Sequence, residues 1–414
     1  MSQPSSEPLN SSTTPLPFTG TTSENTFTTS TNPIQLYTKT WTPSSPSSTH
    51  LIFLHGFSDH INAYYNLFPI LASPPYNITV HGFDQRGWGR SVPDKTHCGL
   101  TGSTELVLND IQDFHAHVSH ILREQHSHNI DKINLFLGGH SMGGAEALTY
   151  MLIPNPAPTR PLVPITGLLL EAPHIAFPRA TQPSALLIFS GRLASRFLPN
   201  TQMLQRLAPD HVSRDPIVVQ QWQNDPLCHD TGTLAGLAGL IDRAEKLNAL
   251  SRTPPAPQTQ SRQSALADSL PCPVFWAHGT GDLICDFAGS QRLFARLTAD
   301  TNTDHTTATK SDIDGSSSSS SSNGNRITAL SEFKTYSDHY HKLHCEPNGA
   351  GEQFAHDMGA WICRVADPGL SLSGVTAGSA SAANQSSSTS PSAVATTTGD
   401  GSGIARPDSG KSRL

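Results

Sequence analysis

Short runs of apolar residues alternate along this chain with longer segments of mixed polarity. Runs of this kind predict strands that are buried on both faces of a sheet. They lie at residues 51–54, 78–83, 133–137, 167–172, 273–278 and 332–336. Residues 33–41 instead alternate apolar and polar side chains, which predicts an antiparallel strand at an exposed edge of the sheet.

The longer segments carry apolar residues at helical spacing. Residues 103–125 are an example, since Leu106, Ile111, Phe114 and Val118 recur along one helical face. Strands that alternate with helices are joined by right-handed crossovers into a parallel sheet. The pattern therefore predicts an α/β fold with a mostly parallel central sheet.

Three segments lack the apolar side chains that would offset the entropy lost on folding. Residues 1–30 and 367–414 are rich in Ser and Thr, and about 300–326 holds a run of seven serines. We expect both ends to be disordered and the serine run to be a solvated insertion. The folded domain is then expected at residues 31–366.

Composition narrows the class of protein. The amino terminus has neither the basic start nor the apolar stretch of a secretory signal, and no apolar run approaches the roughly 18 residues of a membrane span. The six cysteines include no Cys-x-x-Cys pair, which favours reduced thiols in a cytosol. A net charge of -7 without a basic block argues against a nucleic-acid partner. We therefore expect a soluble, cytoplasmic protein.

One Gly-x-Ser-x-Gly sequence, Gly139 to Gly143, lies between a predicted strand and a helical stripe at 145–152. A strand that turns sharply into a helix forces the residue at the turn toward unfavourable backbone angles, and flanking glycines leave room because they have no Cβ. Ser141 at this turn is a candidate nucleophile, and the N–H groups at the start of the helix can stabilise an oxyanion. The alternative is a serine that only caps the helix.

A nucleophilic serine needs a base and a carboxylate that orients the base, and in this type of fold both follow the serine along the chain. Asp282 lies in the loop after the fifth apolar run, and His339, His341 and His344 follow the last one. The spacing alone leaves the three histidines open as the base. Asp286 is a rival carboxylate, but its place before a helical pattern favours a helix cap.

Two other classes of function compete with this interpretation. The three histidines have an H-x-H-x-x-H spacing that suits metal ligands, although no acidic or cysteine cluster elsewhere matches them. A non-enzymatic binding module can keep the same fold, because fold alone does not set function. The presence of a serine, a carboxylate and a histidine at all three triad positions favours the enzyme.

Six stretches of the chain together resemble the monoacylglycerol lipases, a branch of the α/β-hydrolases that also includes lysophospholipase-like and serine-aminopeptidase-like members. They are LHGFSDH (54–60), FDQRGWGRS (83–91), GGHSMGG (138–144), SRDPIVVQQWQNDPL (213–227), HGTGDLICD (278–286) and YHKLH (340–344). The resemblance runs from about Pro33 to Val365. It implies the α/β-hydrolase fold, with helices on both faces of the sheet and a helical cap at about 173–268, inserted after the strand that ends near Glu171.

The resemblance also assigns roles to single residues. It implies Ser141 as nucleophile, Asp282 as orienting acid and His341 as base, because the family pattern reads Tyr-His-x-Leu-His with the first histidine catalytic. The backbone N–H groups of Phe57 and Met142 are implied as the oxyanion hole. The residues expected to support the sharp turn at Ser141 and the neighbouring loop are His55, Gly56, Gly139, His140 and Gly143.

The implied activity is that of a serine ester hydrolase that cleaves monoacylglycerol to fatty acid and glycerol, with lysophospholipids and short esters as alternative substrates. It requires no cofactor and no metal ion. An aminopeptidase would need an acidic pocket for the substrate amine, and none can be placed in the sequence. Cys285, three residues after Asp282, is interpreted as a small buried hydrophobe, with a reactive thiol beside the site as the alternative.

The expected cap contains one amphipathic segment. Residues 184–199 repeat apolar side chains at Leu186, Phe189, Leu193 and Phe197, which predicts a helix. This apolar face either packs on the core or, as the resemblance implies, docks reversibly on a membrane or lipid droplet. The sequence alone does not decide between the two, and it does not set the oligomeric state.

Overall fold

The computed structural model describes residues 15–153, 161–252, 266–267, 269–299 and 326–369. The chain divides into one compact unit of residues 1–372 and a second unit of 373–414. The second unit lies outside the described residues, and so does nearly all of the predicted serine-rich insertion at about 300–326.

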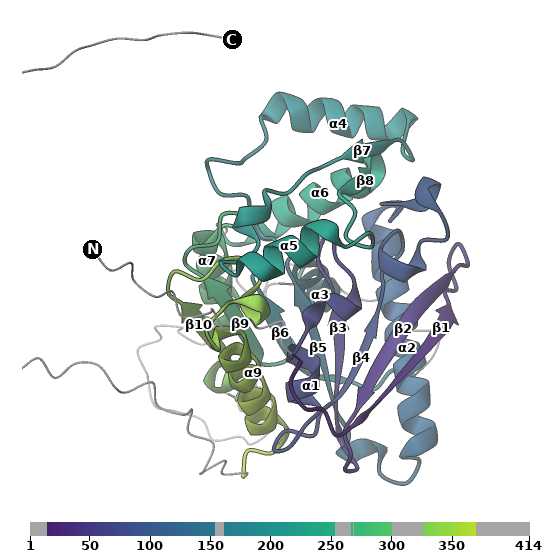
Figure 1. Ribbon diagram of the computed structural model, residues 1–414, viewed down its shortest axis with the longest axis vertical. Coiled ribbons are helices and arrows are strands. Elements are labelled where there is room, and N and C mark those ends of the chain that lie inside the picture. Colours follow the sequence, from purple (N-terminus) through teal and green to yellow (C-terminus); the bar gives the residue numbers. More distant parts are fainter. Residues whose placement is uncertain (1–14, 154–160, 253–265, 268, 300–325, 370–414) are drawn as a thin grey trace, which may run out of the picture. The chain divides into compact units, whose positions relative to one another are not determined.

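The described part of the chain forms an eight-stranded sheet with the order β1-β2-β4-β3-β5-β6-β9-β10 (Figure 1). The six strands predicted from apolar runs are confirmed, and they pair in parallel from β4 to β10. The bounds are β1 Thr21–Thr28, β2 Gln35–Thr42, β3 Thr49–Leu54, β4 Thr79–Phe83, β5 Asn134–His140, β6 Ile165–Glu171, β9 Val274–Gly279 and β10 Glu332–Tyr336.

The amino-terminal edge of the sheet differs from the prediction. Strand β2, the predicted edge strand, is antiparallel as expected, but it pairs with β4 on one side and with β1 on the other. The prediction that β2 lies at the edge of the sheet was therefore wrong. The prediction that disorder extends to residue 30 was also wrong, because β1 lies within that segment. In β1 only Phe27 is buried, where it packs on Phe83 and Phe114. A single buried side chain leaves no apolar pattern, and backbone pairing with β2 holds the strand.

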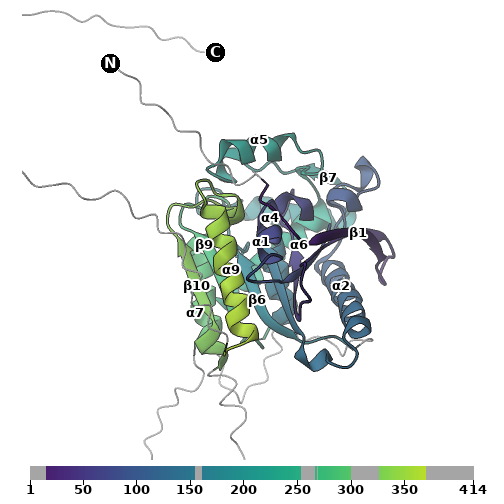
Figure 2. The same cartoon turned by 60° about the horizontal axis from the view of Figure 1, so that its bottom comes forward.

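Successive residues of each central strand point to opposite faces, so both faces need a helical cover. In β3, Ile52 and Leu54 join one hydrophobic core, while Leu51 and Phe53 join the other. Helices α2 (Thr104–Gln125), α3 (Met142–Leu152), α6 (Leu234–Leu250) and α7 (Phe287–Thr298) contribute to the first core. Helices α1 (Leu67–Leu71) and α9 (Ala350–Ala366) contribute to the second, and Figure 2 shows α9 lying along the strands of that face.

A long segment is inserted between β6 and β9, which are hydrogen-bonded neighbours in the sheet. It contains α4 (Ala185–Phe197), β7 (Gln202–Leu204), α5 (Pro216–Asn224), β8 (Thr231–Thr233) and α6. Figure 1 shows α4 above α6, at the end of the sheet where the parallel strands end. None of the α4 residues is buried, and Leu186, Phe189 and Phe197 are 77%, 65% and 76% exposed. Core packing of this apolar face is therefore excluded.

The described residues also contain a helical turn at 326–330 and short 3-10 helices, which are η1 (Ile61–Tyr64), η2 (Gly89–Ser91), η3 (Lys95–His97), η4 (Ile130–Lys132), η5 (Pro209–His211) and η6 (Leu343–Cys345). Helix α7 returns from the carboxyl end of β9 toward the amino end of β10, so the segment of residues 300–325 joins the domain at the edge opposite the carboxyl ends of the strands. Among the described residues, no helix is both long and apolar enough to cross a bilayer.

Candidate active site

Ser141 stands alone between the end of β5 and the start of α3. Its backbone angles are φ 54 and ψ -116, a conformation that costs energy for any residue with a side chain and persists only where the surroundings fix it. The Ser141 N–H donates to the backbone carbonyl of Glu171 at 2.9 Å, and the Ser141 carbonyl accepts from the Ala145 N–H at 3.0 Å. The hydroxyl is thereby held at the carboxyl edge of the sheet, as the sharp turn predicted.

The flanking glycines are required by close packing of the backbone. A Cβ at Gly139 would lie 2.5 Å from the carbonyl of Gly143. A Cβ at Gly143 would collide with the backbone oxygens of Leu54 and His55. Strand β5, helix α3 and the end of β3 therefore approach so closely that only glycine fits at these two positions.

Asp282 and His341 meet at the same edge. Asp282 follows β9 and His341 follows β10, the parallel neighbour of β9. The His341 Nδ1 lies 2.8 Å from the Asp282 Oδ2, and both side chains are buried. The Cys285 thiol lies beside the Ser141 hydroxyl and within 4.8 Å of a side-chain atom of Asp282 and of one of His341, which brings all three predicted residues into one cluster.

Asp282 has a second imidazole partner that sequence reasoning missed. The Nε2 of His278, at the end of β9, lies 3.1 Å from the same Oδ2, and its Nδ1 lies 2.9 Å from the Ser290 hydroxyl. Burial alone would raise the pKa of Asp282, but the charge of His341 and hydrogen bonds from His278 and His341 lower that pKa below its usual range. The signal in the sequence was a histidine four residues before the aspartate.

The other candidates have different partners. Asp286 caps α7 by accepting from the Gly289 N–H at 2.9 Å, as predicted. His339 is on the surface and its Nδ1 lies 2.7 Å from the Ser337 oxygen. His344 is buried with its Nδ1 2.7 Å from the Glu171 carboxylate. Of the three histidines, only His341 contacts Asp282.

Phe57 and Met142, the residues of the implied oxyanion hole, border the cavity that contains Ser141. Met142 is the first residue of α3, and Phe57 lies in the loop after β3. Within the described residues, neither N–H donates a hydrogen bond. The loop before Phe57 is fixed by His55, whose Nε2 accepts from the Gln85 N–H at 2.9 Å while its Nδ1 faces the Gly56 oxygen at 2.8 Å.

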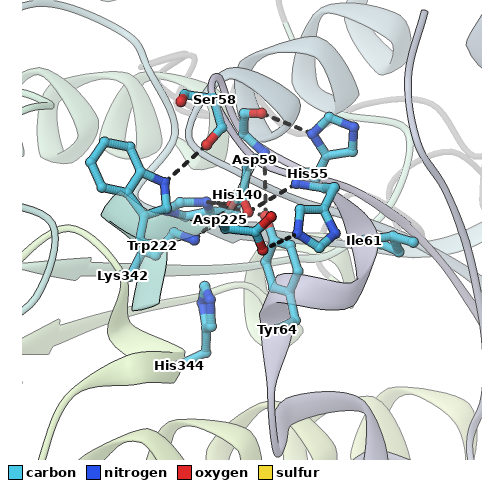
Figure 3. Close-up of polar contacts among 12 residues, drawn as sticks. His55, Ser58, Asp59, Ile61, Tyr64, His140, Trp222, Asp225, Lys342 and His344 are labelled. Atoms are coloured by element: carbon cyan, nitrogen blue, oxygen red, sulfur yellow. Dashed lines mark hydrogen bonds and ion pairs between the residues drawn. The ribbon is translucent and has the colours of Figure 1, made fainter. Parts of the chain in front are cut away.

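A buried ion pair lies beneath this loop (Figure 3). The Lys342 ammonium, next in sequence to His341, lies 2.9 Å from the Asp59 Oδ2. Burial alone would lower the pKa of Lys342, but Asp59 raises it. Burial alone would raise the pKa of Asp59, but Lys342 and His55 lower it below its usual value. Both groups are therefore charged. Sequence reasoning missed this pair, because nothing in the pattern marks Lys342 as buried.

His140, the residue before the nucleophile, packs against this cluster. Its ring lies 4.7 Å from that of His341, and its Nδ1 lies 3.3 Å from the Tyr64 hydroxyl. Burial and then the neighbouring His341 lower the pKa of His140 well below its usual range. His140 is consequently a neutral side chain that fills the space beneath His341.

The inserted segment also contacts the Phe57 loop. The Trp222 Nε1 donates to the Ser58 oxygen at 2.9 Å, and the His60 Nε2 lies 3.0 Å from the Asp225 Oδ2 (Figure 3). His60, Asp225 and Cys228 place one possible metal-ligand atom each within 4.8 Å of one another. A cation there would face the ammonium of Lys342, which is close enough to lower the pKa of Asp225. These contacts therefore fit a structural link better than a metal site.

The cavity has a volume of about 270 Å³ and an apolar wall. Ser141, Phe57 and Met142 form part of it, and α4 and α6 contribute Leu187, Ile188, Leu237 and Ile241. The segments before α4, around β7 and after Asp282 complete the wall. Among the described residues that border this cavity there is no Asp or Glu. In the part of the wall that the structure describes, His174 and Arg192 are the ionisable side chains.

Comparisons with known proteins identify the family to which the chain belongs. The model of the family described as Serine aminopeptidase, S33, matches residues 45–309. A putative monoglyceride lipase of Schizosaccharomyces pombe is 28% identical over 337 residues, which cover 80% of this chain and 72% of that protein. Monoglyceride lipase of Rattus norvegicus is 25% identical and is matched over 79% of this chain and 86% of its own length.

Solved structures share the fold. A soluble variant of monoglyceride lipase from Saccharomyces cerevisiae, in complex with a substrate analog, matches with a TM-score of 0.63 and 20% identity over 85% of this chain and 97% of that chain. Monoacylglycerol lipase of Paleococcus ferrophilus matches with a TM-score of 0.55 and 21% identity over 80% and 100% of the two chains. The predicted resemblance and the α/β-hydrolase fold are confirmed, and the chain belongs to the Serine aminopeptidase, S33, family as a hydrolase of the α/β-hydrolase superfamily.

Proposed function

We propose that the protein is a lipase that hydrolyses monoacylglycerol to fatty acid and glycerol through an acyl-enzyme on Ser141. The observation that carries this proposal is the apolar cavity of about 270 Å³ that has Ser141 in its wall. An acyl chain placed there removes its surface from water while its ester group reaches the serine. The relatives named monoglyceride lipase support the same choice of substrate.

The contacts of the three polar residues suit a triad. His341 accepts the hydroxyl proton as Ser141 attacks the ester carbonyl, and then gives this proton to the departing glycerol oxygen. Asp282, ionised and 2.8 Å from the His341 Nδ1, holds the imidazole in the tautomer with its proton on Nδ1 and stabilises the charged form. Water activated by the same histidine then hydrolyses the acyl-enzyme and restores the free serine.

The tetrahedral intermediate needs hydrogen-bond donors for its oxyanion. The N–H groups of Phe57 and Met142 border the same cavity as Ser141 and supply two donors that no described residue occupies. The Phe57 loop is held by His55 from below and by Trp222 from the inserted segment. We infer that this segment, between β6 and β9, is the cap of the active site.

The composition of the cavity wall argues for a neutral substrate. A peptide amino terminus carries a positive charge and would need a carboxylate, which no described residue of the wall supplies. A lysophospholipid carries a phosphate, and the Arg192 guanidinium that faces this region is already paired with Asp242 and Glu245. Neither charged head group would find an unpaired partner of opposite charge in this wall.

The exposed apolar face of α4 gives such an enzyme a way to reach its substrate. Leu186, Leu187, Phe189 and Phe197 lie on a helix that borders the cavity, and each is more than 60% exposed. An amphipathic helix with this exposure inserts into the surface of a lipid layer and binds reversibly. We infer that α4 docks on membranes or lipid droplets, so that a monoacylglycerol enters the cavity from the lipid.

The test is fatty acid release by the purified protein and by Ser141→Ala. The substrates are monoolein, diolein, lysophosphatidylcholine, a p-nitrophenyl ester and an aminoacyl anilide. We expect preference for monoolein and loss of release in the alanine variant. Serine-dependent hydrolysis of only the lysophospholipid or the anilide would overturn the substrate, and the absence of labelling by a fluorophosphonate would overturn the nucleophile.

A further inference from the structure

His174 lies beside the nucleophile but belongs to none of the contacts described so far. It follows β6, and its N–H donates to the Ser141 carbonyl at 3.0 Å. The main chains of the two residues are therefore adjacent. His174 is one of the residues that line the same cavity as Ser141 and Met142.

The His174 imidazole has a buried nitrogen without a hydrogen-bond partner. The residue is only 5% exposed, and no atom of the described chain bonds its Nδ1. The ring packs edge-on against Phe177, with 4.5 Å between the centroids. A buried polar atom without a partner destabilises a fold unless a water molecule or a ligand satisfies it. A leucine at this position would fill the apolar wall equally well, so packing alone does not require a histidine.

The charge state of His174 limits what it can bind. Burial, followed by the nearby His341 and Arg243, lowers the pKa of His174 to about 4 against the opposing effect of Asp282. Near neutral pH the ring is uncharged, with one N–H donor and one nitrogen acceptor. A neutral imidazole pairs with a group that both donates and accepts, such as a hydroxyl, and gives no advantage to a phosphate or a carboxylate.

We propose that His174 is a specificity-determining residue that hydrogen-bonds a free hydroxyl group of the substrate close to the scissile ester. The inference rests on the proposed function, in which Ser141 attacks an ester bound in this cavity. A monoacylglycerol offers two hydroxyls on its glycerol part, and a hydroxylated acyl chain offers one on the other side of the ester. An ester without such a hydroxyl would leave the imidazole without a polar partner in the cavity, and a site built to bind a hydroxyl discriminates against such an analogue.

The test compares esters that differ in the hydroxyl alone. The ratio of kcat/KM for monoolein to that for ethyl oleate is measured in the same detergent micelles, and again for monobutyrin and ethyl butyrate in solution. Ethyl 3-hydroxybutyrate against ethyl butyrate tests the acyl side. We expect the wild-type protein to favour the glyceryl esters and His174→Leu to lower this ratio about tenfold, the size of one net hydrogen bond.

Three variants separate recognition from packing. His174→Asn keeps a donor and an acceptor and is expected to restore part of the ratio. Leu240→Val changes another part of the wall, on α6, without a hydrogen-bonding group and should leave the ratio unaltered. The melting temperature of His174→Leu should equal or exceed that of the wild type, because an apolar group replaces an unpaired polar one.

The outcomes are distinguishable. An unchanged ratio in His174→Leu, or a wild-type ratio of one, would overturn the role of His174 while leaving the lipase intact. A change confined to the 3-hydroxy ester would assign the hydroxyl to the acyl chain. Activity on the butyrates without release from either oleate would overturn the lipase, and the butyrate ratio would still decide the role of His174. No Ser141-dependent hydrolysis of any ester would overturn both.

Discussion

The Lys342 ammonium and the Asp59 carboxylate form a buried ion pair, 2.9 Å apart, that joins the loop of His341 to the loop of Phe57. One loop carries the proposed base and the other a proposed oxyanion donor. A fixed distance between these loops keeps both groups in register with Ser141 before substrate arrives, which favours electrostatic stabilisation of the transition state.

Removing only one partner of this pair should be strongly destabilising. Lys342→Met leaves the Asp59 charge buried and uncompensated, and we expect a loss of about 3–5 kcal/mol in the free energy of unfolding, measured by urea denaturation. The double variant Asp59→Asn, Lys342→Met should recover much of this loss. Lys39→Met, which breaks the more exposed pair with Glu24, is the control and should cost less than about 1 kcal/mol. Equal effects of Lys342→Met and Lys39→Met would contradict the buried pair.

The pH dependence of stability should depend on His278. A hydrogen bond to a carboxylate stabilises its charged form, so His278→Phe raises the pKa of Asp282. A lowered pKa of Asp282 stabilises the fold near neutral pH, and this contribution is lost as the pH falls through the acidic range. We expect His278→Phe to lower the free energy of unfolding by about 1.5–3 kcal/mol more at pH 7 than at acidic pH, measured by urea denaturation. His278→Gln retains a donor and should lose less, and an equal loss at every pH would indicate a packing defect instead.

Substitution by alanine should have opposite effects on stability at the sharp turn beside Ser141 and in α4. Gly143→Ala forces a Cβ against the backbone of Leu54 and should lower the free energy of unfolding by at least about 1–3 kcal/mol, with loss of activity. Gly191→Ala, in α4, meets open space and should raise helix stability by up to about 1 kcal/mol. Thermal denaturation of both variants measures the contrast, and a neutral Gly143→Ala would refute the close approach.

Lipid binding should reside in α4. Replacing Phe189 and Phe197 with serine removes two exposed rings, and we expect at least about a tenfold weaker association with phosphatidylcholine vesicles in a sedimentation assay. Leu16→Ser, an exposed apolar residue elsewhere, should have no effect on binding. Hydrolysis of a water-soluble p-nitrophenyl ester by the double variant should persist. Unaltered vesicle binding would show that another surface makes the contact.

Thiol reagents should leave the activity intact. Cys285 is completely buried, and burial and then the charge of Asp282 raise the pKa of its thiol well above the usual range. The thiolate, which is the reactive form, is therefore scarce at neutral pH. We expect N-ethylmaleimide at pH 7 to leave hydrolysis of a p-nitrophenyl ester unchanged in the folded protein. Rapid inactivation that Cys285→Ser abolishes would reverse this conclusion and restore the reactive-thiol alternative.

The sequence was sufficient wherever a local pattern determined the structure. The apolar runs predicted every parallel strand, and the glycines around Ser141 predicted the sharp turn, because both effects act within a few residues. Their chain order then placed Asp282 and His341 at one edge, since the carboxyl ends of parallel strands meet there. The choice of His341 among three histidines needed the family pattern.

The features that were missed depend on contacts between distant residues. Strand β1 is held by its pairing with β2 rather than by its own apolar pattern. Lys342 is buried because Asp59, almost three hundred positions earlier, compensates its charge. His174 became conspicuous only when the cavity wall showed that its nitrogen has no partner. Strand pairing, charge compensation and the lack of a hydrogen-bond partner depend on the assembled fold, and no local sequence pattern reveals them.

The long connection between α7 and β10 joins the domain at the edge opposite Ser141. A change in its length affects the chain between the end of α7 and the start of β10. Asp282 and His341 are positioned instead by the carboxyl ends of β9 and β10. Residues 300–325 are thus a permissive site for engineering. A fluorescent protein or an affinity tag inserted there would report on the enzyme without entering its chemistry.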